Sequence, residues 1–286
     1  DAVGALPAMS DFDRRITPAR ADLAAAHLKG KIDAPRYADG KIFQVKAGRA
    51  ALRGKPSNDA GLDTELLYGE RFNVYDVANG WAWGQSLEDD YVGYVRADAL
   101  ADNVSAADHR VIAQMTPVFP AADLKKPVRD FLPLNAKVKV EARDGVYARI
   151  GENAFVFAGH LAPANEMAAD WVEVAERFLR VPYIWGGKTA SGLDCSGLIQ
   201  TAMQAAGMAC PRDTDMQERG VGRAVDSRNL QRGDLVFWKG HVGVMLDASR
   251  LLHANAFHME VRIEPLSEAV ARIEKIAGAI TSVKRR

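Results

Sequence analysis

The feature that most limits the possible folds is a weak internal repeat in a strand-rich stretch. Between Ile42 and Leu161, short runs of Val, Phe, Tyr and Trp alternate with Gly, Pro, Asn and Asp, a pattern typical of β-strands joined by tight turns. A β unit of about 60 residues that occurs twice predicts two small barrels, although a single β-sandwich also accounts for the strands. The repeat is a spacing of 66 positions that joins Leu52, Leu66, Phe72 and Val74 to Val118, Leu132, Val138 and Val140.

The rest of the chain divides around this stretch. A chain of 286 residues, 48% of them apolar, is too long for one ordinary core, so several domains are expected. Near the N-terminus, TPARADLAAAHLKGKI predicts one short helix, with Thr17 as N-cap, Pro18 at the first helical position and Gly30 near the end. We expect an N-terminal arm, two barrels and a C-terminal domain, with these boundaries: 1–40, 41–103, 104–162 and 163–286.

The pattern changes again after Pro163. NEMAADWVEVAERFL has apolar residues at helical spacing and predicts an amphipathic helix. A second helix is expected to start at Cys195 and to end before Gly207. The following GDLVFWKGHVGVMLDASRLLHANAF is typical of successive strands joined by short turns. Helices followed by strands, without alternation, predict an α+β domain with an antiparallel sheet.

Cys195 lies in the first turn of the second expected helix, within SGLDCSGLIQ. A helix N-terminus offers unpaired N–H groups and a positive dipole end, which favour a thiolate and can hold an oxyanion. Asp194 is a natural N-cap, but its charge opposes ionisation of the thiol, so we expect this carboxylate to have a further task, such as binding a substrate ammonium. A structural cysteine and an ordinary cap are the alternatives on the residue pattern alone.

A nucleophilic cysteine needs a base, and two histidines follow it on expected strands. His241 begins HVGVML, and His253 lies in RLLHA on the next strand. One imidazole can act as the base while the other holds it in the productive tautomer. Two histidines on neighbouring strands are also half of a metal site, but no acidic or cysteine partner lies at ligand spacing. We therefore expect no metal and no cofactor.

The two imidazoles can touch only if they lie on the same face of the sheet. The numbers 241 and 253 are both odd. The two histidines therefore share a face only if directly opposed residues of the two strands have numbers that are both even or both odd. A two-residue turn at residues 248–249 would pair Asp247 with Arg250 and place the histidines on opposite faces. We therefore expect an odd-length loop or a β-bulge between Leu246 and His253.

Two longer motifs resemble a known family. VPYIWGGKTASGLDCSGLIQTAMQAAGMACPRDTDMQ and LQRGDLVFWKGHVGVMLDASRLLHA closely resemble the NlpC-type cell-wall cysteine peptidases, which have a papain-like core. The resemblance covers the expected C-terminal domain. It implies a thiol endopeptidase in which Cys195 is the nucleophile, His241 the base and His253 the orienting group. It also places Tyr183 near the oxyanion.

The first β unit adds a second resemblance. LYGERFNVYD, GWAWGQ and YVGYV resemble bacterial SH3-like domains. Two SH3-like β-barrels followed by an α+β papain-like peptidase domain resemble the γ-D-glutamyl-L-diamino-acid endopeptidases of murein-peptide recycling, the dipeptidyl-peptidase VI type. This implies hydrolysis of the γ-D-Glu bond to L-Lys or meso-diaminopimelate in murein tri- and tetrapeptides with a free N-terminal L-Ala, which releases L-Ala-γ-D-Glu. The resemblance places these residues at the substrate: Tyr183, Asp194, Ser196, Thr214, Glu65 and Tyr91, with Glu70 and Tyr94 as alternatives to the last two.

Charge and hydropathy limit the other functions. The 37 Lys and Arg residues balance 37 Asp and Glu residues, so no basic excess points to nucleic acid or an anionic membrane. No apolar run is long enough for a bilayer, and Asp1–Asp11 lacks a signal-peptide pattern. We expect a cytoplasmic monomer, or a periplasmic or secreted protein if an upstream signal has been removed.

Three alternative functions remain open from the sequence. The first is an acyltransferase or amidase on the same thiol core. The second is a secreted cell-wall hydrolase without the free-amine requirement, and the third is a cell-wall-binding protein with an inactive peptidase domain. Only the third lacks an unusually reactive cysteine, so alkylation of the thiol separates it from the others.

The first prediction concerns the nucleophile. Cys195→Ala should abolish turnover of murein peptides and leave the melting temperature nearly unchanged, because one small side chain at a helix start contributes little packing. His241→Ala should lower the rate by several orders of magnitude, as loss of an activating base does. Peptide cleavage by the Cys195→Ala protein would refute a thiol mechanism.

Overall fold

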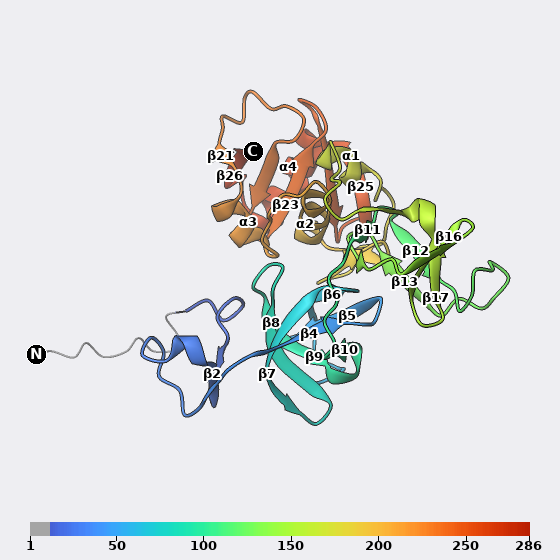
Figure 1. Cartoon of the computed structure of the whole chain (residues 1–286). Coiled ribbons are helices and arrows are strands. Elements are labelled where there is room, and N and C mark those ends of the chain that lie inside the picture. The colour runs from blue at the N-terminus through green and yellow to red at the C-terminus, as the bar shows by residue number, and fades with distance from the viewer. Residues whose placement is uncertain (1–11) are drawn as a thin grey trace, which may run out of the picture. The chain divides into compact units, whose positions relative to one another are not determined.

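The computed structural model describes residues 12–286 and divides them into two compact units (Figure 1). The described part of the first unit comprises residues 12–107 and 136–139, and the second comprises residues 108–135 and 140–286. The N-terminal segment thus groups with the first β unit, and the second β unit groups with the C-terminal domain. The expected arm also included Asp1–Asp11, which lies outside the described residues.

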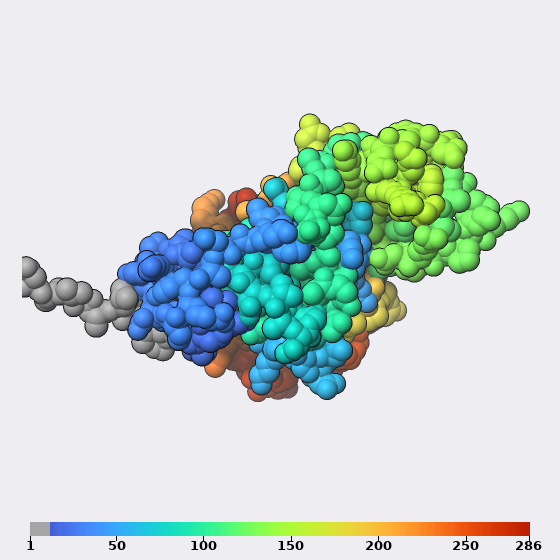
Figure 2. Space-filling model, turned by 60° about the horizontal axis from the view of Figure 1, so that its bottom comes forward, coloured from blue at the N-terminus to red at the C-terminus, as the bar shows by residue number. Residues whose placement is uncertain are grey.

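The helix predicted between Thr17 and Gly30 is wrong. The segment forms a three-stranded sheet, and only a 3-10 helix, η2 (Ala26–Leu28), is helical there. Consecutive residues of β2 are all buried, together with Tyr75, Trp83 and Val92 of the first β unit, so burial on both sides of the chain overrides helix propensity. Figure 2 shows this segment in blue beside the cyan strands of the same unit. The strands are β1 (Ala19–Arg20), β2 (Leu23–Ala25) and β3 (Tyr37–Ala38).

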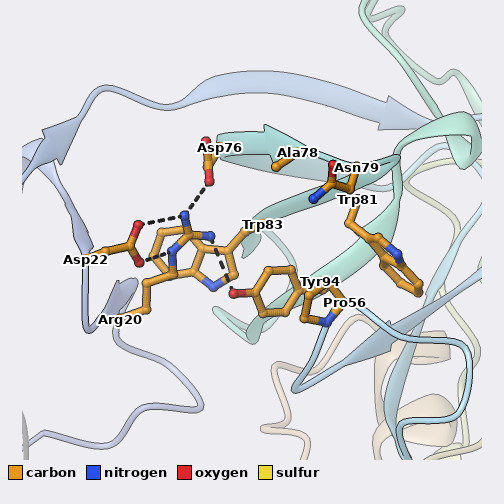
Figure 3. Close-up of a pocket in the computed structure, with 9 residues that line it drawn as sticks. All are labelled: Arg20, Asp22, Pro56, Asp76, Ala78, Asn79, Trp81, Trp83 and Tyr94. Atoms are coloured by element: carbon orange, nitrogen blue, oxygen red, sulfur yellow. Dashed lines mark hydrogen bonds and ion pairs between the residues drawn. The ribbon is translucent and has the colours of Figure 1, made fainter.

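Arg20 links this segment to the strands beneath it. Its guanidinium lies 4.8 Å from the ring centroid of Trp83, and it forms ion pairs with Asp22 and Asp76 (Figure 3). These side chains and Tyr94 line a cavity of about 410 Å³ within the first unit. The guanidinium of Arg20 is therefore the cation that lies among these aromatic rings and carboxylates. Its contacts hold the N-terminal segment against the strands.

The first β unit is one strongly paired sheet. Its seven strands lie in the order β10-β4-β7-β8-β9-β5-β6, and its core contains Leu52, Leu66, Phe72 and Val74, the four residues that begin the sequence repeat. This arrangement agrees with the expected small barrel. The elements are β4 (Lys41–Val45), β5 (Arg49–Arg53), β6 (Leu62–Leu67), β7 (Arg71–Ala78), β8 (Trp81–Ser86), β9 (Val92–Arg96), η3 (Ala97–Ala99) and β10 (Leu100–Ala101).

The second β unit repeats the strand pairing of the first at the same spacing. Ala50 pairs with Leu66 in the first unit, and Thr116 pairs with Leu132 in the second. The next hairpin repeats in the same way, since the pair Ala78 with Trp81 corresponds to Asp144 with Tyr147. The predicted duplication of a β unit is thereby confirmed in the backbone register.

The sheets of the second β unit are shorter than those of the first. Its apolar repeat positions Val118, Leu132 and Val138 are buried, whereas Val140 is half-buried. The elements are β11 (His109–Val111), β12 (Met115–Val118), β13 (Asp130–Pro133), β14 (Lys137–Val138), β15 (Ala142–Asp144), β16 (Tyr147–Gly151), β17 (Ala154–Phe157), η4 (Ala158–His160) and β18 (Leu161–Pro163).

The C-terminal domain has the predicted α+β order. Both predicted helices are present, although the first begins at its Asp170 N-cap, later than the apolar pattern suggested. The predicted strands form an antiparallel sheet in the order β21-β26-β22-β23-β24-β25. The elements are α1 (Trp171–Glu176), β19 (Lys188–Thr189), β20 (Gly192–Leu193), α2 (Cys195–Ala205), α3 (Thr214–Gly220), β21 (Arg223–Ala224), β22 (Leu235–Trp238), β23 (His241–Met245), β24 (Arg250–Asn255), β25 (Glu260–Pro265), α4 (Leu266–Ala277) and β26 (Ser282–Arg285).

Both faces of this sheet are covered by helices. Val242 and Val244 of β23 join the core that includes α1 and α2, whereas Met245 joins the core that includes Ala269 of α4. Alternate residues of a strand point to opposite faces, so His241, at an odd position, belongs to the α4 face. Helices α1 and α2 thus cover one face of the sheet and α4 covers the other, and His241 is the first residue of its strand, at the end of β23.

The second prediction concerns a close backbone approach in the first compact unit, which includes residues 136–139. Gly69 and Gly30 have the same left-handed backbone, with φ of +81° and +82°. A Cβ on Gly69 would lie 2.0 Å from the carbonyl oxygen of Lys137, whereas a Cβ on Gly30 would meet nothing within 4 Å. Gly30→Ala should therefore destabilise the unit by about 1–2 kcal/mol of backbone strain, and Gly69→Ala by at least about 2 kcal/mol more.

Differential scanning calorimetry of the two variants checks this comparison. Gly30→Ala is the matched control, because it introduces the same backbone strain without the steric clash. Equal melting temperatures for the two variants would contradict the close packing of Gly69 against Lys137.

Candidate active site

Cys195 is the first residue of α2 and is buried, at 7% exposure. Its Sγ lies 3.7 Å from Oγ1 of Thr214, and the backbone N–H of Val242 acts to lower the pKa of the thiol. Val242 follows His241 in β23, so the thiol lies near the start of the strand that begins with the first expected histidine. As the N1 residue, Cys195 also has a backbone N–H without an acceptor within the helix.

Asp194 caps α2 and is tied to a buried arginine. Its Oδ1 accepts the N–H of Gly197 at 2.7 Å, and its Oδ2 accepts the N–H of Gly186 at 2.8 Å. Arg212, only 1% exposed, donates to both carboxylate oxygens, at 2.9 and 2.8 Å. Arg212 also donates to Oγ of Ser196 at 2.9 Å. The charge of Asp194 is therefore balanced by a bidentate pair within the domain.

Arg212 is the residue of this site that the sequence reasoning missed. It lies in PRDTDMQ, the same stretch that contains Thr214. The sequence signal was an arginine in a motif two residues before the candidate threonine. A buried cation is expected only beside an anion, and Asp194 is that anion.

Tyr183 lies in the segment that precedes α2. Its backbone bridges to Leu193, one residue before the N-cap. Burial raises the pKa of the Tyr183 phenol, and the negative charge of Cys195 when it is ionised and that of Asp194 also act to raise it. Tyr183 therefore remains a neutral hydrogen-bond donor beside the thiol. The structure thus brings together four of the expected residues near Cys195: Tyr183, Asp194, Ser196 and Thr214.

The thiol is protonated in the resting protein. Burial, together with the charge of Asp194, raises the pKa of Cys195 to about 11. The hydrogen bonds from Thr214 and the Val242 amide, together with the charge of Arg212, act in the opposite direction but do not outweigh burial. The expectation that the helix N-terminus alone favours a thiolate is therefore not met, and a base must remove the proton during attack.

The hairpin between β23 and β24 places both histidines on one face. Val244 pairs with Leu252, and Leu246 donates its N–H to the carbonyl of Arg250 at 2.9 Å, so residues 247–249 form a three-residue loop. The predicted odd-length loop is confirmed. As a consequence, Nε2 of His241 lies 2.8 Å from Nδ1 of His253.

Burial keeps the histidine pair neutral. His253 has no exposed surface, and the ring of His241 lies 5.7 Å from the ring of Trp238. Burial, together with the neighbouring His253, lowers the pKa of His241 to about 3. Burial also lowers the pKa of His253, against the opposing effect of Glu264. Neutral imidazole is the form that can accept a proton from a thiol.

Glu264 and Arg272 are further residues that the sequence reasoning missed. Oε1 of Glu264 lies 2.6 Å from Nε2 of His253, and Arg272 of α4 donates to both oxygens of Glu264, at 2.9 Å to Oε2. Burial acts to raise the pKa of Glu264, but the hydrogen bonds from His253 and Arg272 outweigh it and hold the pKa at about 2. No sequence motif indicates these residues, because Glu264 contacts His253 only through the pairing of β24 with β25.

The expected substrate residues of the first unit have contacts of their own. Glu65, 3% exposed, forms an ion pair with Arg49 at 2.5 Å. Tyr91 is buried in the core of the first barrel. Among the alternatives, Glu70 accepts the N–H of Leu67 at 3.0 Å in a turn, and Tyr94 lines the cavity around Arg20.

Within residues 12–286, no three His, Cys, Asp or Glu side chains cluster in a way that could hold a metal ion. Over the same residues, no helix combines the length and apolar character needed to cross a bilayer.

The third prediction follows from the half-buried, neutral His241. Below the ordinary histidine pKa of about 6.5, the unfolded chain binds a proton at His241 that the folded protein does not bind. Stability from this group is therefore complete above pH 6.5 and is lost as the pH falls toward the folded pKa of about 3. The expected slope is about 1.4 kcal/mol per pH unit for such a histidine.

Calorimetry of the wild type and of His241→Gln between pH 7 and pH 4 measures this effect. The variant lacks the titrating group, so its melting temperature should fall less steeply with acid. Equal slopes for the two proteins would contradict a His241 that stays neutral in the folded protein.

Family models match the C-terminal domain and the first barrel. Residues 180–277 match the NlpC/P60 family, and residues 52–100 match the bacterial dipeptidyl-peptidase SH3 domain. The first match contains Cys195, His241 and His253, and the second lies in the first barrel.

Relatives of known name match over most of the chain. A γ-D-glutamyl-L-lysine dipeptidyl-peptidase of Bacillus cereus is 28% identical over 78% of this chain and 76% of its own length. Dipeptidyl-peptidase 6 of Lysinibacillus sphaericus is 27% identical over 78% of this chain and 91% of its own length. The crystal structure of an NlpC/P60 family protein from Bacillus cereus matches the fold with a TM-score of 0.72 at 20% identity, over 85% of this chain and 99% of that chain. We conclude that the chain carries an NlpC/P60 domain behind a bacterial dipeptidyl-peptidase SH3 domain, and that it is a cysteine peptidase.

Proposed function

We propose that this peptidase hydrolyses the γ-D-glutamyl bond to L-Lys or meso-diaminopimelate in murein peptides and releases L-Ala-γ-D-Glu. The observation that carries the proposal is the thiol of Cys195 at the start of α2, next to the strand that begins with His241. The names of two relatives, γ-D-glutamyl-L-lysine dipeptidyl-peptidase and dipeptidyl-peptidase 6, support the substrate class.

The proposed reaction proceeds through a thioester. As the thiol attacks the γ-carbonyl carbon of D-Glu, its proton passes to His241, and a tetrahedral oxyanion forms. The N–H of Cys195 and the neutral phenol of Tyr183 are the donors proposed for this oxyanion. His241 then protonates the departing amine of the diamino acid. Water, deprotonated by His241, hydrolyses the thioester and regenerates the thiol.

We propose that the free amine of L-Ala is bound beside Asp194. An ammonium buried in a cleft needs an anionic partner, because an unpaired buried charge is unfavourable. Asp194 is paired with Arg212, and Glu65 of the SH3 domain, our candidate for a second carboxylate, is paired with Arg49. A carboxylate has several lone pairs, so each would accept a hydrogen bond from the ammonium in addition to its ion pair. Ser196 and Thr214 are proposed to bind the same end of the peptide, and Tyr91 to contribute with Glu65.

The proposed setting is that of a recycling enzyme. A substrate with a free N-terminal L-Ala is a peptide already released from the glycan, and such a peptide suits a cytoplasmic monomer with no nucleic-acid or membrane partner. The equal numbers of basic and acidic residues support this proposal. A secreted cell-wall hydrolase would instead accept peptides whose L-Ala is linked to the glycan.

The fourth prediction tests the amine requirement. N-acetylation of L-Ala-γ-D-Glu-L-Lys removes the ammonium, adds bulk and abolishes the charge-assisted hydrogen bonds that the ammonium would donate. We expect kcat/KM to fall at least ~10²-fold, about 3 kcal/mol, the scale of losing a buried charge-assisted hydrogen bond. Product formation from the free and acetylated peptides, measured by chromatography, gives the ratio.

Equal rates for the two peptides would exclude the recycling function and favour the wall hydrolase. Alkylation of Cys195 by iodoacetamide serves as the control, since it reports an intact nucleophile without using either peptide.

A further inference from the structure

His253 contacts an ionised carboxylate on the side away from His241. Glu264 lies on β25, where it pairs with Leu251 of β24, so its side chain shares a face of the sheet with His253. Its Oε1 lies 2.6 Å from Nε2 of His253. Arg272 of α4 neutralises the carboxylate by donating to both of its oxygens. The carboxylate is buried, at 7% exposure, and is therefore held in place by these two partners.

This contact determines which nitrogen of His253 carries the proton. An ionised carboxylate only accepts hydrogen bonds, so a separation of 2.6 Å requires a proton on Nε2. The amide of Asn255 lies 3.1 Å from the same nitrogen, and it cannot donate to a nitrogen that is already protonated. The shorter contact with the charged acceptor decides the tautomer, and Nδ1 of the neutral ring keeps its lone pair.

The tautomer of His253 in turn determines that of His241. The lone pair on Nδ1 of His253 faces Nε2 of His241 at 2.8 Å, so this Nε2 must be the donor. A neutral His241 then has an unprotonated Nδ1, the one ring nitrogen left for the proton of Cys195. The opposite tautomers would place an N–H on Nδ1 of His241, which cannot accept the thiol proton.

We propose that Glu264 is a positioning residue, which fixes the tautomers of His253 and His241 so that Nδ1 of His241 is free to act as the base. The proposal rests on the proposed function, because it assigns Glu264 to the same reaction. When His241 accepts the thiol proton, its Nε2–H still donates to His253, so the arrangement suits both protonation states.

Other charged groups face His253 from each element around it. Arg262 is its cross-strand partner on β25 and forms an ion pair with Glu260 at 3.0 Å. Arg272 faces it from α4, and His258 faces it from the segment after β24. Glu264 is the carboxylate among these groups that contacts the ring, so it is the group expected to set the tautomer.

Nitrogen-15 NMR of histidine-labelled wild-type protein at pH 7 tests the proposal without any variant. The ring nitrogen shifts of His241 and His253, assigned by loss of signals in His241→Gln and His253→Gln, distinguish the two tautomers. The expected result is a proton on Nε2 of both rings. A proton on Nδ1 of either ring would overturn the proposal.

Glu264→Gln and Glu260→Gln form a matched pair for kinetics. Both variants remove a carboxylate of β25 that pairs with an arginine, but only Glu264 contacts His253. Glu264→Gln should lower kcat about 10- to 100-fold with little change in KM, the usual effect of losing an orienting partner, and should slow alkylation of Cys195 by iodoacetamide. Glu260→Gln should leave both values near wild type.

Equal kcat and alkylation rates for the two variants would overturn the assignment of Glu264. Alkylation and NMR use no murein peptide, so these readouts test the role of Glu264 even if the proposed substrate is wrong. If Glu264→Gln fails to fold, the tautomers of the wild-type protein still decide the question.

Discussion

The buried ion pair between Asp194 and Arg212 holds the nucleophile side of the site together. It joins the N-cap of α2, the Gly186 loop that follows Tyr183, and the segment that leads into α3 with Thr214. Removing one partner of a buried pair leaves an uncompensated charge, which usually destabilises a protein by about 3–5 kcal/mol. The position of the thiol therefore depends on a charge pair that is formed within the domain.

The base side of the site depends on the sheet. The three-residue loop at 247–249 sets the register that brings His241 and His253 onto one face, and α4 covers that face with Arg272. Burial of these groups keeps the thiol and both imidazoles neutral at rest. The reaction then needs a defined path for one proton, and a fixed histidine tautomer supplies it.

The sequence predicted the parts of the structure that leave a local pattern. The β repeat, helix α2 and the parity of the hairpin follow from periodicity and numbering, and the structure confirms them. The N-terminal helix failed because Leu23 and its neighbours are buried by a sheet, which local propensity does not reveal. Arg212 and Glu264 were missed for the same kind of reason, since their partners lie 18 and 11 positions away in the sequence.

The most direct test of the account is the identity of the products. Mass spectrometry after incubation of the wild-type protein with L-Ala-γ-D-Glu-L-Lys should find L-Ala-γ-D-Glu and free L-Lys in equal amounts. In water enriched in oxygen-18, the label should appear in the γ-carboxylate of the glutamate, where the thioester is hydrolysed. Free L-Ala as the first product, or an intact tripeptide in the presence of an alkylatable Cys195, would contradict the assignment.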